Sequence, residues 1–253
     1  WDIGTDGIDL NSGTFVATSG SFTVAGDWDM TGNGTFDPGT GTIIFDGSDV
    51  QSITSNSQAF YNVQNSNSTS SVNLTDDLQL NSAGTLTING GSVFSLAGNQ
   101  FDHNNATIIN NGIFEMNGNE SFAPTSLDLP GNVRIVGTIF STNGLASMDD
   151  VEFAPVNGKL TLGSDIDFIT GNITVAENDT FDMDIYDLVL ANRKTVMNNG
   201  IWLAPESDSK FICLGNATFD GLDMNFSYLI ANSSFTDTLI FNGGNSYVIS
   251  DSL

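Results

Sequence analysis

Short apolar runs, in which every second side chain is hydrophobic, recur along the whole chain and are separated by polar corners. Leu86–Ile88, Val93–Leu96 and Ile113–Met116 are examples, and they are bounded by Asn-Gly, Gly-Gly, Ala-Gly or Asn-Asn pairs. Alternation with a period of two indicates strands with one buried face. The bounding pairs tolerate the positive φ angles of tight corners. The pattern therefore predicts an all-β chain of short strands.

Two long segments of the chain repeat each other. Residues 84–116 align with residues 171–204, at an offset of 87 in the first half and of 88 in the second, where TIINNGIF meets TVMNNGIW. The match extends upstream, and partial copies flank both segments. We predict one elongated repeat domain over residues 1–253, made of a partial copy (1–58), two copies (59–147 and 148–218) and a second partial copy (219–253).

The repeat length favours a solenoid. An offset near 88 is four times about 22 residues, which is in the range of one coil of a parallel β-solenoid. A hairpin meander would use the same strands and Asn-Gly turns. Each repeat, however, has too little apolar surface to fold alone and must stack on its neighbours. We therefore predict a parallel β-solenoid of about eleven coils, with tandem β-sandwich domains as the alternative.

A series of short motifs over residues 26–91 has a recognisable order. The motifs are Gly26/Trp28, Gly34–Phe36, Gly39–Gly47, Gln51/Ile53, Phe60–Val63 and Gly84–Gly90. This order resembles the repeat of large prokaryotic surface proteins and of adhesin-like proteins of the right-handed β-helix type. The similarity is degenerate over 92–206 and faint beyond, and Met148–Val151 departs from the Phe-Tyr-Asn-Val motif. The resemblance implies a right-handed β-helix in a secreted or cell-surface protein that serves adhesion or forms a structural fibre.

The charge balance excludes several kinds of partner. The chain has 30 Asp and Glu against 5 Lys and Arg, which gives a net charge of −25. Nucleic acids and anionic membrane surfaces require clustered cations, which this sequence lacks. No apolar run approaches the roughly 18 residues of a membrane helix, so we expect no membrane insertion within this chain. The chain begins at Trp1 without a signal-peptide pattern, and we expect a mature product or an internal fragment.

Clusters of aspartate are candidate cation sites. Calcium binds several carboxylate or carbonyl oxygens around one point, and solenoid turns can supply them. The stretch that begins at Asp27 and Asp29 has the opening spacing of a calcium loop, but Pro38 occupies the position of the closing acid. Asp77 and Asp165 align between the two copies. The calcium candidates are therefore Asp27, Asp29, Asp77 and Asp165, and the alternative is a solvated acidic surface.

Ten Asn-x-Ser/Thr acceptors for N-glycosylation are present, modestly more than composition alone would give. Such sites require only an exposed loop in a secreted chain. Asn73 and Asn172 lie at expected strand edges and are expected to be less accessible. The acceptors are Asn33, Asn67, Asn73, Asn105, Asn119, Asn172, Asn178, Asn216, Asn225 and Asn232.

Other reactive side chains are predicted to be structural. Cys213 lies in an apolar run, which indicates an inert strand thiol, and no disulfide or zinc spacing exists. His103 is predicted to be a turn residue rather than a base. The Arg193-Lys194 pair is predicted to be a turn that neutralises Asp187.

The aromatic residues divide into two groups. Phenylalanines are predicted to stack inside the solenoid, whereas an exposed tryptophan could bind glycans or a second subunit. The phenylalanines are Phe94, Phe114, Phe181 and Phe211, and the tryptophans are Trp1, Trp28 and Trp202.

The features together predict a non-catalytic, extracellular protein with no catalytic residues and no cofactor other than calcium. We expect a structural or adhesive surface protein that joins end to end into a homopolymer, because uncapped solenoid ends leave strand edges that invite pairing. One alternative is a β-helix polysaccharide hydrolase that uses pairs of aspartates. Another is an adhesin module that binds surface glycans.

Overall fold

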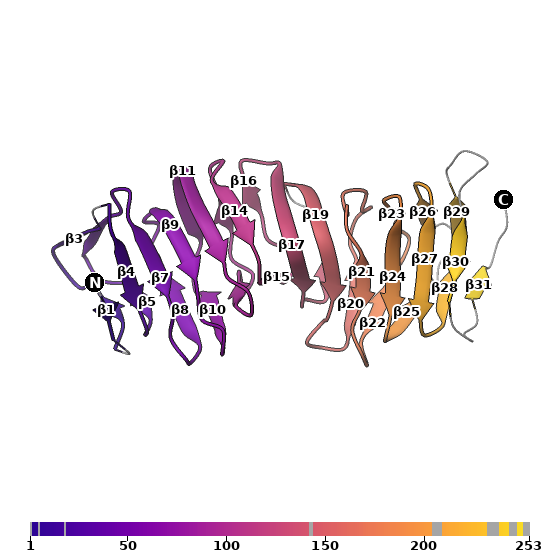
Figure 1. Cartoon of the computed structure of the whole chain (residues 1–253), viewed down its shortest axis with the longest axis horizontal. Helices are drawn as coiled ribbons and strands as arrows, with labels where there is room; N and C mark the ends of the chain where they lie inside the picture. The colour runs from indigo at the N-terminus through magenta and orange to yellow at the C-terminus, as the bar shows by residue number, and fades with distance from the viewer. Residues whose placement is uncertain are drawn as a thin grey trace. The chain divides into compact units, whose positions relative to one another are not determined.

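The computed structural model describes residues 2–4, 6–17, 19–141, 144–203, 209–231, 238–242 and 247–249. Over these residues the chain is all-β with no helix, and its parallel sheets stack as a β-solenoid of about 10 turns (Figure 1). The predicted parallel solenoid is confirmed, with about 10 turns in place of about eleven. Tandem β-sandwiches are wrong, since such sandwiches are built from antiparallel sheets and the paired strands here are parallel.

The chain forms two compact units. The first unit comprises Trp1–Met116, Glu120–Asn132 and Asn143–Ala146, and the second comprises Asn117–Asn119, Val133–Thr142 and Ser147–Leu253. Strands β17 (Leu127–Ile135) and β19 (Leu145–Phe153) contribute residues to both units. The last segment of the second unit begins at Ser147, one residue before the start of the second predicted copy at position 148.

Strands of the first unit pair in parallel into two long sheets and a short one. The first sheet has the order β1-β4-β7-β9-β11-β13-β16, and β14 also pairs with β11. The second sheet has the order β2-β5-β8-β10-β12-β15, and the short sheet is the pair β3-β6. The strands are β1 (Asp2–Ile3), β2 (Ile8–Asp9), β3 (Thr14–Val16), β4 (Ser21–Val24), β5 (Trp28–Asp29), β6 (Thr35–Asp37), β7 (Thr42–Phe45), β8 (Gln51–Thr54), β9 (Phe60–Asn65), β10 (Ser71–Leu74), β11 (Leu78–Ile88), β12 (Val93–Ser95), β13 (Phe101–Asp102), β14 (Thr107–Asn110), β15 (Ile113–Met116) and β16 (Phe122–Ala123).

Strands of the second unit repeat this arrangement. The sheet orders are β19-β21-β24-β27-β30, β18-β20-β22-β25-β28-β31 and β23-β26-β29. The further strands are β18 (Ile139–Phe140), β20 (Lys159–Leu162), β21 (Ile173–Val175), β22 (Thr180–Asp182), β23 (Leu188–Leu190), β24 (Lys194–Asn198), β25 (Ile201–Leu203), β26 (Lys210–Cys213), β27 (Ala217–Gly221), β28 (Met224–Phe226), β29 (Tyr228–Ala231), β30 (Leu239–Phe241) and β31 (Tyr247–Ile249).

The strand register gives the coil length directly. Ile43 of β7 pairs with Val63 of β9, and Phe181 of β22 pairs with Trp202 of β25, so each position lies beside its counterpart on the next coil. These two pairs are 20 and 21 residues apart, and the hydrogen bond from the Asp187 amide to the Asp165 carboxylate spans 22 residues. The coil length of about 22 residues predicted from the repeat is therefore confirmed.

The core of each unit is a ladder of apolar side chains from successive coils. Phe94, Phe114, Phe181 and Phe211 are all fully buried, as predicted. The alternative that Trp28 or Trp202 is exposed and binds a ligand is wrong, because both side chains have no exposed surface.

Each of these two tryptophans lies among phenylalanine rings of its own coil and of the adjacent coils. The Trp28 ring is 4.8 Å from that of Phe36, and the Trp202 ring is 4.7 Å from that of Phe181, both centroid to centroid and edge to face. Such aromatic pairs stabilise the core beyond the burial of their area. The third candidate, Trp1, lies outside the described residues.

Candidate functional site

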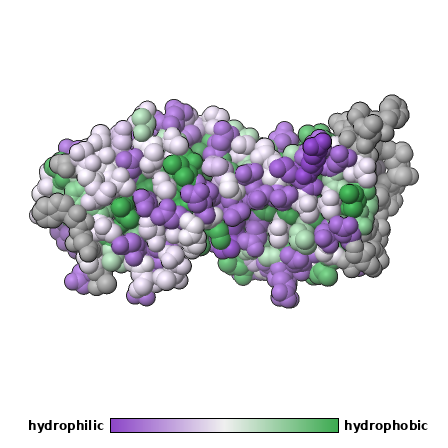
Figure 2. Space-filling model, in the orientation of Figure 1, coloured by the Kyte–Doolittle hydropathy of each residue, from purple (hydrophilic) through white to green (hydrophobic). Residues whose placement is uncertain are grey.

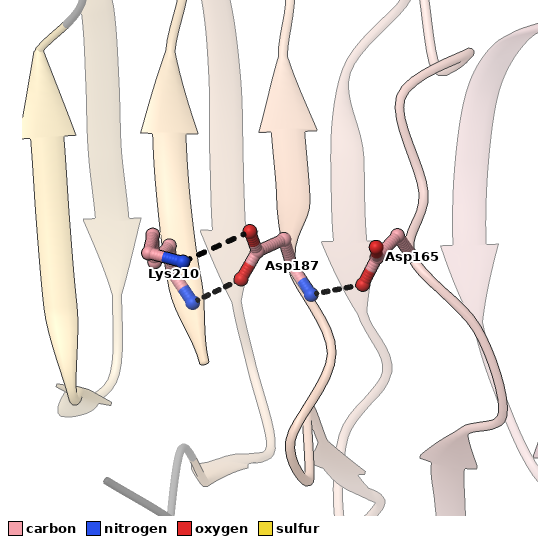
Figure 3. A network of polar contacts seen from close by, with 3 residues as sticks. All are labelled: Asp165, Asp187 and Lys210. Atoms are coloured by element: carbon pink, nitrogen blue, oxygen red, sulfur yellow. Dashed lines mark hydrogen bonds and ion pairs between the residues drawn. The ribbon is translucent and has the colours of Figure 1, made fainter. Parts of the chain in front are cut away.

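Aspartate carboxylates in the second unit connect one coil to the next (Figure 3). The Asp165 Oδ1 atom accepts a hydrogen bond of 2.9 Å from the backbone N–H of Asp187, one coil later. The Asp187 Oδ1 atom in turn accepts one of 2.8 Å from the backbone N–H of Lys210. The Lys210 ammonium also lies 3.5 Å from Asp187 Oδ2. Each carboxylate therefore accepts a hydrogen bond from a backbone N–H at the start of a strand, which has no partner in the regular β-ladder.

The prediction that Arg193 and Lys194 neutralise Asp187 is corrected by this arrangement. The cation on Asp187 is Lys210, which lies in register on the next coil. Arg193 lies at an exposed turn with a positive φ of 61°. Neighbours along the sequence are thus less informative in this fold than residues one coil away.

A second ladder of the same kind runs along another sheet of the second unit. Asp150 Oδ1 accepts from the backbone N–H of Asn172 at 2.7 Å, and Asn172 Oδ1 accepts from the N–H of Thr195 at 2.9 Å. The first unit has the equivalent contact from Asn62 Oδ1 to the N–H of Thr85 at 3.0 Å. Since Asn62 aligns with Asp150 in the repeat, an amide and a carboxylate perform the same task at equivalent positions.

The four calcium candidates do not converge: three of them accept a backbone hydrogen bond from the next coil, whereas Asp29 accepts one from Thr31, two residues later. Asp77 Oδ1 accepts from the N–H of Gln100, Asp27 Oδ1 from that of Ser52, and Asp29 Oδ1 from that of Thr31. Asp165 accepts from the next coil, as described above. Among the residues placed in the structure, no group of three or more His, Cys, Asp or Glu side chains lies close enough to hold a metal ion. The aligned pair Asp77 and Asp165 is thus equivalent in its backbone contacts.

Buried amide side chains form a further set of coil-to-coil contacts, which the sequence reasoning missed. Asn198 has no exposed surface, and its Nδ2 donates to the carbonyls of Asp223 at 2.8 Å and Leu222 at 3.4 Å. Its Oδ1 accepts from the N–H of Gly200 at 3.2 Å. Asn110 of the first unit makes the equivalent contacts, to the carbonyls of Pro130 and Asn132 and from the N–H of Gly112. The Asn-Asn-Gly sequence that the two copies share was the available signal.

One carboxylate has a perturbed pKa. Burial, and secondarily the negative charge of Glu152, raise the pKa of Asp179 above its ordinary value of 3.8. Glu152 is itself paired with Arg134, at 2.8 Å from the guanidinium Nε. Ionised Asp179 therefore lies in an environment that disfavours its charge.

We expect Asp179→Asn to stabilise the folded chain slightly at neutral pH. A raised folded-state pKa means that the folded chain binds this proton more tightly than the unfolded chain, so the cost of ionised Asp179 exists above the folded pKa and disappears as the pH falls below 3.8. Because the side chain is partly solvated, the gain is at most about 1 kcal/mol. Urea denaturation at neutral pH and near pH 3, where aspartate is mostly protonated, measures this gain in the free energy of unfolding. Equal gains at both pH values, or an equal gain for Glu177→Gln in the same turn, would contradict this origin.

The remaining reactive side chains are enclosed. His103 is 4% exposed and its Nε2 lies 2.8 Å from the carbonyl oxygen of Pro124, next to a turn at residues 104–105. Cys213 is buried in β26, and burial raises the pKa of its thiol to about 12. A protonated, buried thiol is a poor nucleophile. The prediction of a buried strand thiol is confirmed.

The glycosylation acceptors differ in accessibility. Asn67 is fully buried, and its Nδ2 donates to the carbonyl of Asp49 at 2.7 Å, so it does not fit a glycan in the folded chain. Asn73 and Asn216 are half-buried, whereas Asn172 is exposed, contrary to the expectation from its strand edge. Asn232 lies outside the described residues. The exposed acceptors are Asn33, Asn105, Asn119, Asn172, Asn178 and Asn225.

The described residues line surface hollows in both units. The first unit has one of about 230 Å³, lined among others by Asp77, Gln79, Gln100 and Asp102. Its two acids are both occupied: Asp77 accepts from the Gln100 amide, and Asp102 Oδ2 accepts from Gln79 Nε2 at 3.0 Å. The second unit has hollows of about 370 and 400 Å³, lined mainly by Asn, Thr and aliphatic residues.

No family model, curated protein or solved structure matches the chain. Nor does the described part of the chain contain a helix that is long and apolar enough to span a membrane.

Proposed function

We propose that this chain is a structural and adhesive segment of an extracellular surface protein, and that it has no catalytic role. The proposal rests on one observation, which is that polar side chains of the protein form hydrogen bonds between successive coils. Carboxylates and amides such as Asp187, Asn172 and Asn198 are engaged in bonds from one coil to the next. Groups held in this way support a repetitive scaffold, whereas a catalytic site requires convergent groups free to meet a substrate.

The acidic balance supports an extracellular location. A net charge of −25 keeps neighbouring scaffolds apart in solution and limits lateral clumping. The resemblance of residues 26–91 to surface-protein repeats points in the same direction. Exposed acceptors such as Asn105 and Asn178 are available for glycans in a secreted chain.

Strand edges at the outermost described coils suit end-to-end joining. β1, β2 and β3 each pair with one following strand, and β29, β30 and β31 each pair with one preceding strand. A parallel strand edge carries N–H and C=O groups that can pair with a further coil. In this proposal, a second copy of the chain supplies that coil, and the partner is the protein itself.

We expect the purified chain to form concentration-dependent linear assemblies. Light scattering coupled to size-exclusion chromatography, and negative-stain microscopy over a range of concentrations, measure this. Ile240→Lys is expected to weaken assembly, because a lysine on edge strand β30 opposes pairing with another strand. Ile201→Lys is the matched control, since Ile201 is similarly exposed but β25 is paired on both sides. A monodisperse monomer at the highest concentration would contradict end-to-end joining.

A further inference from the structure

One face of the first unit is a regular array of uncharged side chains. The side chains that point outward from β4, β7, β9, β11 and β14 stand in two columns across the parallel strands, because the strands are in register. The inward neighbours, such as Ile43, Val63 and Leu86, are buried. We call this array the neutral strip. Its columns are Ser21, Thr42, Asn62, Thr85 and Thr107, and Thr23, Ile44, Gln64, Thr87 and Ile109.

The strip has no charge although the chain carries 30 acidic and 5 basic side chains. Figure 2 shows mostly pale side chains, of intermediate hydropathy, over the part of the molecule where Figure 1 labels β4, β7 and β9.

The equivalent face of the second unit differs in this respect. Its columns follow the same repeat positions but contain three acids, which are Asp150, Glu152 and Asp220. Gln64 of the strip aligns with Glu152, and Thr87 aligns with Thr174. The repeat therefore accepts acids at these positions, and their absence from the strip is a property of the first unit.

Hydrogen bonds hold three adjacent polar side chains of the first column, those of Thr42, Asn62 and Thr85. Asn62 Nδ2 donates to Thr42 Oγ1 at 3.3 Å, and Thr85 Oγ1 donates to Asn62 Oδ1 at 3.0 Å. In the second column, Gln64 Nε2 donates to Ser66 Oγ at 2.9 Å. Side chains that are already ordered lose little conformational entropy when a ligand binds.

The dimensions of the strip favour a thin, repeating ligand. Adjacent strands are about 4.8 Å apart and same-face residues about 6.7 Å apart, so the strip is about 19 Å long and two side chains wide. This corresponds to an area on the order of 300 Å², well below the roughly 800 Å² per partner of a standard protein interface. The strip is thus too small for a stable contact with a second copy or another globular protein.

We infer that the neutral strip binds an extended, uncharged polysaccharide that lies across the strands. The hydroxyl groups of such a polysaccharide repeat with a period close to the strand spacing. Each sugar can therefore form a hydrogen bond with the side-chain hydroxyl or amide of one coil. The methyl groups of Thr and Ile contact the C–H surface of the sugar. Acidic polysaccharides are disfavoured by the −25 net charge of the chain. This inference rests on the adhesive part of the proposed function and assigns it to one surface.

Binding is tested by co-sedimentation of the whole chain with insoluble cellulose, chitin and β-1,3-glucan, with alginate beads as the acidic polymer. We expect retention on at least one neutral polymer and none on alginate. Gln64→Glu changes one side chain to the residue that the second copy carries and is expected to weaken retention about tenfold, because it places an unpaired charge against a neutral ligand. Thr87→Asp should act in the same way. Thr174→Asp, at the equivalent position of the second unit, should leave retention unchanged.

The inference is overturned if no neutral polymer retains the chain, if alginate retains it equally well, or if Gln64→Glu and Thr174→Asp have the same effect. Gln64→Glu is nearly isosteric at a half-buried surface position, so loss of folding does not confuse the result. Assembly measured by light scattering is independent of this assay. A chain that assembles but is not retained keeps the structural part of the proposal and loses the strip.

Discussion

Asn198→Asp is expected to destabilise the folded second unit by about 3–5 kcal/mol at neutral pH, the usual cost of an uncompensated buried charge. The side-chain amide of Asn198 donates hydrogen bonds to the backbone carbonyls of Asp223 and Leu222. A carboxylate has no hydrogen to donate, so it would face two carbonyl oxygens from a fully buried position. Below the pKa of the new side chain the loss should shrink, because the protonated form again offers one donor.

Urea denaturation followed by circular dichroism at neutral and acid pH measures this effect. The matched control is Asn199→Asp, which adds the same charge at the exposed next residue and should change stability by less than about 0.5 kcal/mol. Equal stabilities of the Asn198 and Asn199 variants would show that the buried amide does not connect the coils.

Trp202→Ala is expected to cost about 3–5 kcal/mol, the range for removal of a large buried aromatic side chain. The Trp202 ring packs against the ring of Phe211 on the same coil, at a centroid distance of 5.6 Å, and against one ring on each adjacent coil. These are the rings of Phe181 and Phe226, at 4.7 and 5.9 Å. Its loss would leave a cavity that these rings could fill only by shifting several strands. In a stacked repeat, such a defect weakens the contacts on both sides of the coil.

Thermal denaturation with near-UV circular dichroism detects the loss of fixed aromatic packing. Ile201→Ala is the control, because Ile201 lies next to Trp202 on β25 but points outward and is 53% exposed. The control should change stability by less than about 1 kcal/mol. A Trp202 variant as stable as the control would mean that this ring is not part of the core.

The repeat predicted the fold because it reflects a physical requirement. Leu86 and Ile173 align at an offset of 87, and both are buried on strands that continue the stack. An inward position must stay apolar in each coil, so the alternation and the offset together indicate stacked parallel coils. Phe94 and Phe181 align and are buried for the same reason.

The candidate site was less predictable, since its contacts join side chains on different coils that are far apart in the sequence. Lys210 could be assigned to Asp187 only once the register of β23 and β26 was known. The sequence does not indicate the buried role of Asn198, because an Asn-Asn-Gly sequence looks the same whether its first amide points outward or inward. Trp202 shows the same ambiguity, since a single aromatic residue carries no information about which face it occupies.

Nuclear Overhauser contacts between backbone protons of the deuterated, reprotonated chain test the account most directly. Parallel stacking predicts contacts between Val63 and Leu86, and between Leu86 and Ile108, which are in register on adjacent coils. Contacts between strands consecutive in sequence in an antiparallel pattern, for example between residues 60–65 and 71–74, would contradict it.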